Sequence, residues 1–583
     1  MEIRKGIPVS PGIAISEAYV LDSEEARIPR RNILEEETEQ EVERLLRGVA
    51  DAVKEIRESQ QRAELKIGKE YLSIFDTHVA TLERGLKDEF VQRIREDHYS
   101  AEYAVSKVMR RYVKVMLADE YTAARVGDIY DIQKRLLKCL LGERRANIKN
   151  LTEPVVIIAH DLTPSQTVEF EKNKVKGFAT DAGGKTSHVA ILARAMSLPA
   201  VVGLGTITAD VSGGDSVIID GNSGTVIINP DDDTLRKYRQ LARSLEIFEM
   251  KLAVELHDLP AETNDGCRVA IYANIEFPEE VPMAVERGAE GIGLYRTEYL
   301  YVQKGRMPTE KEHFEAYYQA LRQLNGRPLT IRTLDMAGDK FFGDMPQTQM
   351  RNPLLGLRSI RLSFEQIDIF KTQLRAILRA SVYGRVRVLF PMITTRGEIL
   401  RAREILDEVA AELEVEGVPY EKTIEVGIMV EVPSAALISD VLAQEVDFFS
   451  IGTNDLVQYC MAVDRANEQV AKLYQPAHPA VLRLIKNTID VGNRYQDATR
   501  RGINVGMCGE MSGDIIYTIL LLGLGLKEFS VSSAVIPEIK NMIRSVDMKT
   551  ARSIADEALK FADAEQTQQY LKEITEQHGG RGA

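Results

Sequence analysis

Apolar and polar positions follow three different spacings along the chain, and each spacing predicts a different architecture. Between residues 34 and 141 proline is absent, and within Glu35–Leu65 apolar residues such as Val42, Leu45 and Val49 recur at helical intervals. This spacing predicts an all-helical subdomain. The pattern leaves open whether the segment is purely structural or is a docking platform for a partner.

A strand-like pattern replaces the helical one from Pro154 onward. Gly221–Gly224 separates two apolar runs and predicts a hairpin, and residues 1–20 add a short strand-like run with the turn Pro8–Gly12. The pattern predicts a small α/β unit, followed by one polar helix over residues 232–258. The strand-like runs are Val155–Ala159, Gly177–Thr180, Pro199–Val202, Val217–Asp220 and Thr225–Ile228.

Residues 261–583 carry the clearest architectural pattern of the chain. Eight strand-like runs recur there, and each is followed by a helix-like segment. Eight alternating units of this kind predict a TIM barrel, with room for insertions. The runs are Val269–Asn274, Gly291–Arg296, Leu329–Asp335, Val386–Met392, Val426–Glu431, Phe448–Asn454, Val505–Cys508 and Phe529–Ser532.

Composition narrows the class of protein. A length of 583 residues suggests three or four domains, and a net charge of −14 argues against a general nucleic-acid binder. We find neither a secretory signal nor a run of about 18 apolar residues, so we expect a cytoplasmic protein without membrane insertion. The four cysteines (Cys139, Cys267, Cys460 and Cys508) are far apart, which disfavours a disulfide framework or a structural zinc site.

Polar side chains stand at or just after the C-terminal ends of the eight barrel runs, where the catalytic face of a TIM barrel lies. Two carboxylates with an amide predict a Mg²⁺ site, and arginine on the same face suits a phosphate or a carboxylate. Each residue could instead form an ion pair at the barrel mouth, and a free cysteine is commonly a small core residue. The six residues are Arg296, Arg332, Glu431, Asn454, Asp455 and Cys508.

A second candidate lies in the segment Asp181–Met196, where two glycines lead into a helix that begins near His188. Unpaired backbone N–H groups at a helix start favour an anion, so they could stabilise a phosphoryl group carried by this histidine. A P-loop is excluded because Ala179 stands where that motif needs glycine. By itself, a lone histidine is more often a surface or capping residue.

Seven motifs follow one another along essentially the whole chain: Ser10–Ala14, Asp161–Ser165, Gly183–Gly203, Gly293–Glu298, Arg332–Lys340, Asp447–Asp455 and Met507–Glu510. Each alone is modestly specific, and the histidine and barrel motifs occur in the wider phosphoenolpyruvate-utilising group. Because the motifs occur in this order, and because a helical segment over residues 34–144 stands ahead of the histidine unit, the chain resembles the enzyme I family of the bacterial sugar phosphotransferase system. The members of this family are phosphoenolpyruvate–protein phosphotransferases.

The resemblance implies a reaction and its residues. The phosphoryl group of phosphoenolpyruvate passes to Nε2 of His188, pyruvate is released, and Cys508 matches the proton donor. Glu431 and Asp455 match the Mg²⁺ ligands. The residues implied in substrate binding are Arg296, Arg332, Asn454, Asp455 and Arg465, with Lys340 and Arg358 lining the phosphate side.

The resemblance also implies partners and domains. A histidine-containing phosphocarrier protein receives the phosphoryl group from His188 after docking on the helical subdomain, and the barrel forms a homodimer. The implied domains are a swivelling α/β phosphohistidine domain (1–20 plus 145–230), the helical subdomain (21–144), a helical linker (231–260), the barrel (261–575) and a disordered tail (576–583).

Small departures and alternative functions remain. Lys185 stands where the family usually has arginine, so we do not expect it to be essential. A nitrogen-regulatory form of the enzyme is disfavoured because no sensor domain precedes residue 1, and an ATP-linked relative is disfavoured because a nucleotide-binding unit is missing. A catalytically inactive phosphoenolpyruvate sensor with the same fold is the remaining alternative.

Overall fold

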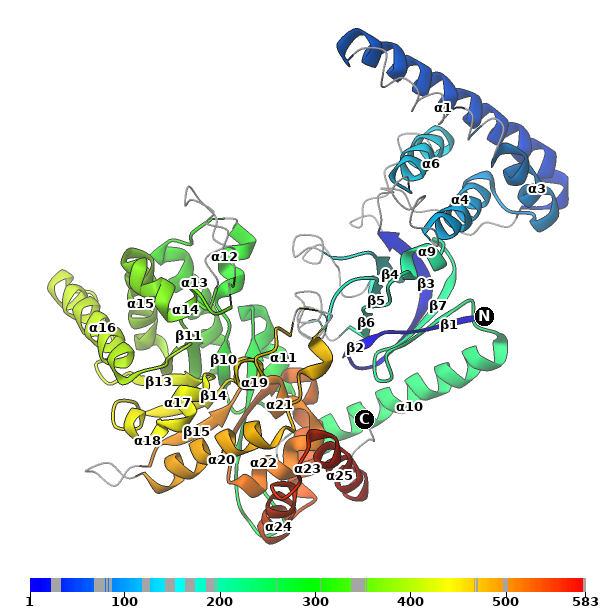
Figure 1. Ribbon diagram of the computed structural model, residues 1–583. Helices are drawn as coiled ribbons and strands as arrows, with labels where there is room; N and C mark the ends of the chain where they lie inside the picture. Colours follow the sequence, from blue (N-terminus) through cyan, green and yellow to red (C-terminus); the bar gives the residue numbers. More distant parts are fainter. Residues whose placement is uncertain are drawn as a thin grey trace. The chain divides into compact units, whose positions relative to one another are not determined.

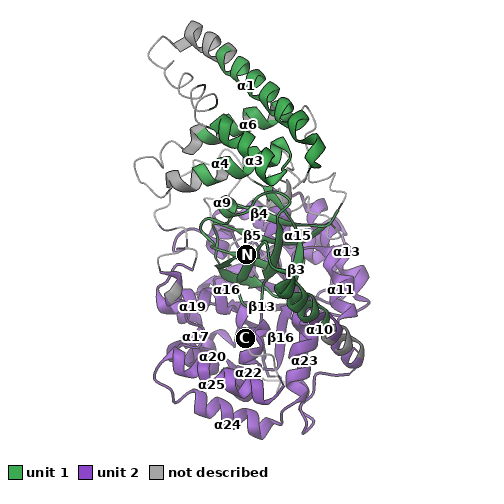
Figure 2. Cartoon of the chain, turned by 90° about the vertical axis from the view of Figure 1, so that its right-hand side faces the viewer, with its two compact units in different colours: residues 1–244 green, residues 245–583 purple. Residues whose placement is uncertain are grey.

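In the computed structural model the chain forms two compact units, residues 1–244 and residues 245–583 (Figures 1 and 2). The described residues are all except 22–32, 68–78, 80–81, 83–85, 118–125, 142–152, 163–173, 185–192, 194–195, 197, 258, 305, 337–351, 353, 466, 468–469, 496–501 and 580–583. Among the described residues, no helix combines the length and the apolar composition needed to cross a membrane.

The described residues between 34 and 141 of the first unit are mainly helical, as the spacing of apolar residues predicts. Their buried faces share one core, in which Leu45, Phe90 and Leu136 are fully enclosed. The Tyr103 hydroxyl donates a hydrogen bond to Asp215 at 2.9 Å and ties this core to the α/β part of the unit. The elements are η1 (Glu35–Glu37), α1 (Thr38–Ile67), α3 (Lys87–Asp97), α4 (Ala101–Leu117) and α6 (Val126–Leu141).

The α/β part is one sheet with the strand order β1-β8-β7-β3-β4-β5-β6-β2. β3 and β4 are parallel neighbours, so the helices are inserted between two adjacent strands of the sheet. The predicted hairpin is the antiparallel pair β7–β8. The elements are β1 (Glu2–Lys5), β2 (Ile7–Ser10), β3 (Ile13–Leu21), β4 (Val155–Ala159), β5 (Val175–Thr180), β6 (Ala200–Val202), α9 (Ile207–Asp210), β7 (Ser216–Asp220) and β8 (Thr225–Ile228).

One prediction about the first residues needs correction. Pro8, which we expected in a turn, lies inside β2 and pairs with β6. β2 is the last strand of the sheet, and proline, which has no N–H to donate, is tolerated in edge strands.

The second unit contains a closed barrel of eight parallel strands (Figure 1), which confirms the predicted TIM barrel. β16 closes it by pairing with β9, with Phe529 beside Ile271. The strands are β9 (Ala270–Ile275), β10 (Ile292–Tyr295), β11 (Leu329–Arg332), β12 (Val386–Phe390), β13 (Glu425–Val430), β14 (Phe448–Ile451), β15 (Asn504–Met507) and β16 (Glu528–Ser532).

Helices surround the barrel and share a large core with the outer faces of its strands. A separate small cluster, made by Leu294, Leu389, Met429, Phe448 and Cys508, packs side chains from different strands together. The helices are α11 (Val281–Glu286), α12 (Glu298–Lys304), α13 (Glu310–Leu324), α14 (Ser359–Glu365), α15 (Ile367–Ala380), α16 (Arg396–Glu416), α17 (Pro433–Leu437), α18 (Ser439–Leu442), α19 (Thr453–Met461), α20 (Pro479–Arg494), α21 (Glu510–Gly513), α22 (Thr518–Leu524), α23 (Ile536–Arg544), α24 (Met548–Ala558) and α25 (Ala564–Gln577).

Two barrel strands end three residues earlier than we expected. β11 ends at Arg332 because the N–H groups of Leu334 and Asp335 donate to side chains, those of Gln373 and Glu298, and no longer to a neighbouring strand. β14 ends at Ile451, and Asn454 lies in the first turn of α19. As a result, Asp335 lies in the loop after β11 and Asn454 lies at the start of α19, both at the barrel mouth.

The predicted polar helix is α10 (Asp232–Leu256), and its end is held by the barrel. Nζ of Lys540, a buried residue of α23, donates to the carbonyl of Leu256 at 3.0 Å, and Arg544 donates to the carbonyl of Pro260 at 2.9 Å.

At the other end of the barrel sequence, α25 continues through Gln577, so residues 576 and 577 are helical where we expected a disordered tail.

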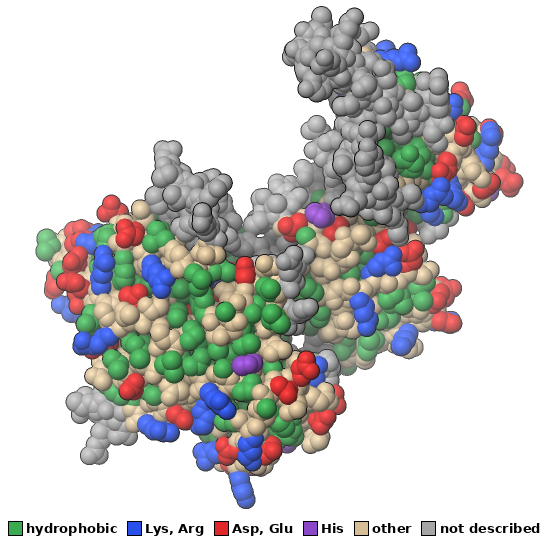
Figure 3. Space-filling model, in the orientation of Figure 1, with side chains coloured by type: hydrophobic (Ala, Val, Ile, Leu, Met, Phe, Trp, Pro, Cys, Tyr) green, Lys and Arg blue, Asp and Glu red, His purple; other side chains and the backbone are tan. Residues whose placement is uncertain are grey.

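On the face shown in Figure 3, basic and acidic side chains of the described residues are interspersed.

Candidate active site at the barrel mouth

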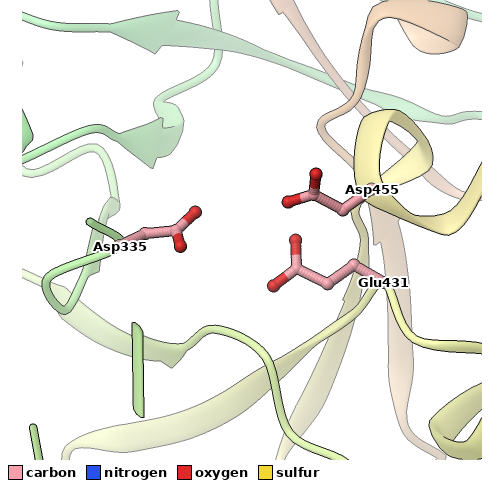
Figure 4. Close-up of side chains that lie close together, drawn as sticks. All are labelled: Asp335, Glu431 and Asp455. Carbon is pink, nitrogen blue, oxygen red and sulfur yellow. The ribbon is translucent and has the colours of Figure 1, made fainter. Parts of the chain in front are cut away.

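Three carboxylates meet at the C-terminal ends of the barrel strands (Figure 4). Asp335 follows β11, Glu431 follows β13, and Asp455 lies in the first turn of α19. Each offers one oxygen, and these oxygens lie within 4.8 Å of one another. Glu431 and Asp455 are buried, and the Asp335 side chain is 5% exposed, so the three charges share a site with little access to water.

Arg332, the last residue of β11, is held between two carboxylates. Its Nη1 lies 2.8 Å from Oδ2 of Asp335, and its Nη2 lies 3.1 Å from Oε2 of Glu298. The other Glu298 oxygen accepts the backbone N–H of Asp335 at 2.9 Å. Nε of Arg332 is buried and has no hydrogen-bond partner among the described residues, so one donor of this guanidinium is available to a ligand.

Arg358, which directly precedes α14, brings a second guanidinium to the same carboxylates. Its Nη2 lies 3.0 Å from Oδ1 of Asp335 and 3.3 Å from Oδ2 of Asp455. Its Nη1 donates to the Tyr459 hydroxyl at 3.2 Å. The Ser359 hydroxyl donates to Asp335 as well. Arg358 therefore links the loop after β11 to the first turn of α19.

The surroundings shift the pKa values of Glu431 and Asp335 in opposite directions. Burial, together with the charges of Asp335 and Asp455, raises the pKa of Glu431 well above its usual value. Burial acts in the same direction on Asp335, but the guanidiniums of Arg332 and Arg358 outweigh it and lower the pKa of Asp335. Asp335 is thus an anion fixed by arginines, whereas the Glu431 anion is not compensated to the same extent.

The remaining described candidates surround this cluster. Arg296 directly follows β10, and its Nη1 pairs with Glu276 at 3.1 Å. Nη2 of Arg465 lies 3.8 Å from Oδ1 of Asp455, and its Nη1 has no hydrogen-bond partner among the described residues. Oδ1 of Asn454 accepts the N–H of Glu510 at 2.8 Å, which joins the starts of α19 and α21.

Cys508 directly follows β15 and is buried. Its sulfur accepts a hydrogen bond from the Ser450 hydroxyl at 3.1 Å. Burial raises the pKa of the thiol, and the charge of Glu431 acts in the same direction, whereas the Ser450 hydrogen bond and the charges of Arg332 and Arg296 oppose the rise. The thiol is therefore protonated at neutral pH and lies in the field of the barrel-mouth charges.

The structure brings together Arg332, Arg358, Glu431, Asp455 and Arg465, with Arg296, Asn454 and Cys508 beside them. His188 and Lys340 lie outside the described residues. Sequence reasoning assigned no role to Asp335 or Glu298, although both stand inside quoted motifs, three and two residues after an arginine at a strand end. That short spacing from Arg332 and Arg296 is the signal by which both could have been found.

A divalent cation fits this donor set. Oxygen ligands at this spacing are those that Mg²⁺ prefers, and Oδ1 of Asp455 is buried without a hydrogen-bond donor among the described residues. The carboxylates of Glu298, Asp335, Glu431 and Asp455 also outnumber the guanidiniums that contact them. Arginines with unpaired donors beside such a cation form a site for a small anion that carries phosphate and carboxylate groups.

Comparison with known proteins gives one consistent answer. Three family models match: "PEP-utilising enzyme, PEP-binding domain" over residues 251–548, "PEP-utilising enzyme, mobile domain" over 151–224, and "PEP-utilising enzyme, N-terminal" over 5–125.

Curated relatives match along nearly their whole length. A phosphoenolpyruvate-protein phosphotransferase of Geobacillus stearothermophilus is 45% identical, covering 97% of this chain and 97% of the relative. The protein of that name from Haemophilus influenzae is 42% identical, covering 98% of each chain, and that from Bacillus subtilis is 41% identical, covering 98% of this chain and all of the relative. The chain therefore belongs to the phosphoenolpyruvate-protein phosphotransferase family of PEP-utilising enzymes.

Proposed function

We propose that this protein transfers the phosphoryl group of phosphoenolpyruvate to its own His188, releases pyruvate, and passes the phosphoryl group on to a histidine-containing phosphocarrier protein. This would be the first step of a sugar phosphotransferase system, and we place it in the cytoplasm. The observation that carries the proposal is the meeting of Arg332 and Arg358 with three carboxylates at the mouth of the barrel. Family membership supports it.

Substrate binding is assigned to the arginines. Phosphoenolpyruvate carries a phosphate and a carboxylate, both of which a guanidinium can grip with two parallel hydrogen bonds. Arg332 and Arg465 each keep one buried nitrogen without a hydrogen-bond partner among the described residues, and such a donor gains most from an anionic ligand. Arg296, Arg358 and Asn454 complete the proposed binding site, and Lys340 is assigned to its phosphate side.

Glu431 and Asp455 are the residues proposed to hold Mg²⁺, and Asp335 is near enough to be a third ligand. A bound Mg²⁺ would neutralise part of the negative charge that develops during phosphoryl transfer. The Glu431 anion would also be stabilised, because the cation would offset the like charges that raise its pKa.

Cys508 is the proposed proton donor. When the phosphoryl group leaves for His188, the remaining enolate must take a proton at its methylene carbon to become pyruvate. A thiol that burial keeps protonated at neutral pH, in the field of Arg332 and Arg296, suits this task. Cys508 could instead be a small core side chain. That role would explain its packing against Met429 and Phe448, but it would not explain why the cysteine lies beside the charged cluster.

The domain roles belong to the same proposal. Residues 1–20 and 145–230 would carry His188 as a swivelling domain, residues 21–144 would dock the phosphocarrier protein, and residues 231–260 would link them to the barrel. The barrel, residues 261–575, would bind phosphoenolpyruvate and form a homodimer.

Intact-mass spectrometry tests the proposal. Full-length protein mixed with Mg²⁺ and phosphoenolpyruvate should gain the mass of one acid-labile phosphate and release pyruvate, and His188→Ala should do neither. Addition of a histidine-containing phosphocarrier protein should then remove the phosphate. Substrate binding without any gain in mass would contradict the phosphotransferase function and favour the inactive sensor.

A further inference from the structure

Ser450 and Cys508 form a buried contact between two neighbouring barrel strands. Ser450 lies in β14 and Cys508 directly follows β15, and Ser450 pairs with Gly506 in the register of the two strands. The Ser450 hydroxyl donates to the Cys508 sulfur at 3.1 Å, and both residues are buried. Among the described residues the thiol also makes one longer hydrogen bond, in which its S–H donates to the carbonyl of Ile451 at 3.8 Å.

The backbone of Cys508 is held without help from Ser450. Its N–H donates to the carbonyl of Ile451 at 3.1 Å, and its carbonyl accepts from Nδ2 of Asn274 at 3.1 Å. Asn274 is fixed in turn by the Ser530 hydroxyl, which donates to its Oδ1 at 2.6 Å. Loss of the Ser450 hydroxyl therefore changes the environment of the sulfur and leaves the anchors of the backbone in place.

The hydrogen bond from Ser450 grows stronger as the thiol loses its proton. A hydroxyl that donates to a neutral sulfur makes a weak bond, whereas one that donates to a thiolate makes a charge-assisted bond. Little water reaches this sulfur, so a preorganised donor there stabilises developing charge more than it would in water. Because the hydroxyl hydrogen occupies one side of the sulfur, the S–H bond is directed to another side.

We propose that Ser450 is a positioning residue for the proton transfer: it orients the Cys508 thiol and stabilises the thiolate that remains. This inference rests on the proposed function of Cys508. In the step, the S–H bond breaks and a C–H bond forms at the methylene carbon of the enolate. The electron pair of the S–H bond stays on sulfur, the enolate becomes the ketone of pyruvate, and water returns a proton to the thiolate.

The test measures pyruvate formation in a single turnover of the full-length protein with Mg²⁺ and phosphoenolpyruvate. Ser450→Ala should slow this step by about 10- to 100-fold, the range for a hydrogen bond to a charged group, with the KM for phosphoenolpyruvate unchanged. In a Cys508→Ala background the same substitution should cause no further loss. Thr518→Val, which removes a buried hydroxyl on α22 that has no partner among the described residues, is the control and should leave the rate unchanged.

A second pair of variants separates the hydroxyl from packing. Ser450→Thr and Ser450→Val add side chains of nearly equal shape, so their folding should suffer equally, while only threonine can donate to the sulfur. The threonine variant should turn over faster than the valine variant.

Four results would overturn the inference. Equal rates for Ser450→Thr and Ser450→Val would show that the hydroxyl has no role. A further loss in the Cys508→Ala background would show that Ser450 acts independently of the thiol. Normal turnover by Cys508→Ala would show that Cys508 is not the proton donor, and this inference would fail with it. Slow turnover by Cys508→Ala together with normal turnover by Ser450→Ala would refute only the role of Ser450.

Discussion

Nη2 of Arg358 lies 3.3 Å from Oδ2 of Asp455, although 97 positions separate the two residues in the chain. The same nitrogen lies 3.0 Å from Oδ1 of Asp335. One guanidinium thus compensates two carboxylates of the barrel mouth, and because Arg358 is buried its charge is poorly replaced by solvent.

Removal of Arg358 should destabilise the barrel for this reason. We expect Arg358→Ala to lower the free energy of unfolding of the barrel by about 3 to 5 kcal/mol, because it leaves buried carboxylates without their partner. Arg358→Lys should recover part of the loss, since lysine keeps the charge but cannot contact both carboxylates and Tyr459 at once. Urea denaturation measures the effect, with Arg361→Ala in α14, the helix that Arg358 precedes, as the control. Equal stability of Arg358→Ala and Arg361→Ala would contradict the bridging role.

Asp335 should contribute to metal binding. Its oxygen lies within 4.8 Å of those of Glu431 and Asp455, so we expect Asp335→Asn to raise the Mg²⁺ concentration needed for half-maximal activity by about tenfold or more. The measurement is pyruvate formation against Mg²⁺ concentration, with Glu404→Gln on the exposed side of α16 as the control. An unchanged Mg²⁺ requirement would restrict Asp335 to holding the two arginines.

Glu298 should act on phosphoenolpyruvate binding through Arg332. It holds Nη2 of this arginine and the N–H of Asp335 at the same time. Glu298→Ala frees both groups, so we expect the KM for phosphoenolpyruvate to rise by about tenfold, the effect of losing a hydrogen bond to a charged group. Glu298→Gln keeps a single acceptor oxygen and can hold only one of the two groups, so its KM should fall between those of wild type and the alanine variant. Steady-state kinetics measure the KM of wild type, Glu298→Gln and Glu298→Ala. A normal KM in the alanine variant would refute the positioning of Arg332 by Glu298.

His313 should make the stability of the barrel depend on pH. It is buried in α13, with Nδ1 3.0 Å from the Tyr317 hydroxyl, and burial lowers its pKa from 6.5 to about 4. The unfolded chain therefore takes up a proton below pH 6.5, whereas the folded protein does so only near pH 4. Between these values the folded state should lose up to about 3 kcal/mol as the pH falls, and above pH 6.5 this contribution should be constant.

The variant His313→Gln isolates this effect, because glutamine does not titrate. Urea denaturation at several values between pH 7 and pH 4.5 should show a smaller loss of stability for the variant than for wild type. Parallel pH profiles for the two proteins would show that groups other than His313 dominate the loss of stability in acid. Glu280 acts in the opposite direction, because burial raises its pKa to about 7 and the folded protein takes up that proton before the unfolded chain does.

Several features were predictable because their signals are local. The eight strand–helix alternations of the barrel and the hairpin β7–β8 follow from short apolar runs and turn residues, and the positions of Arg296 and Glu431 follow from where two of those runs end. The exact ends of β11 and β14 were not predictable. The end of β11 depends on the side chains of Gln373 and Glu298, which are distant in sequence and accept the backbone N–H groups of Leu334 and Asp335.

By itself the sequence determined the order of the elements, the parallel barrel and the family, because hydrophobic periodicity and contiguous motifs are properties of neighbouring residues. Only the tertiary structure decided that Arg358 compensates both Asp335 and Asp455, that Glu298 holds Arg332, and that Ser450 donates to Cys508. These contacts join residues from different strands and loops. Their charges and hydrogen bonds depend on distance and burial, which exist only once closure of the barrel has brought the strand ends together.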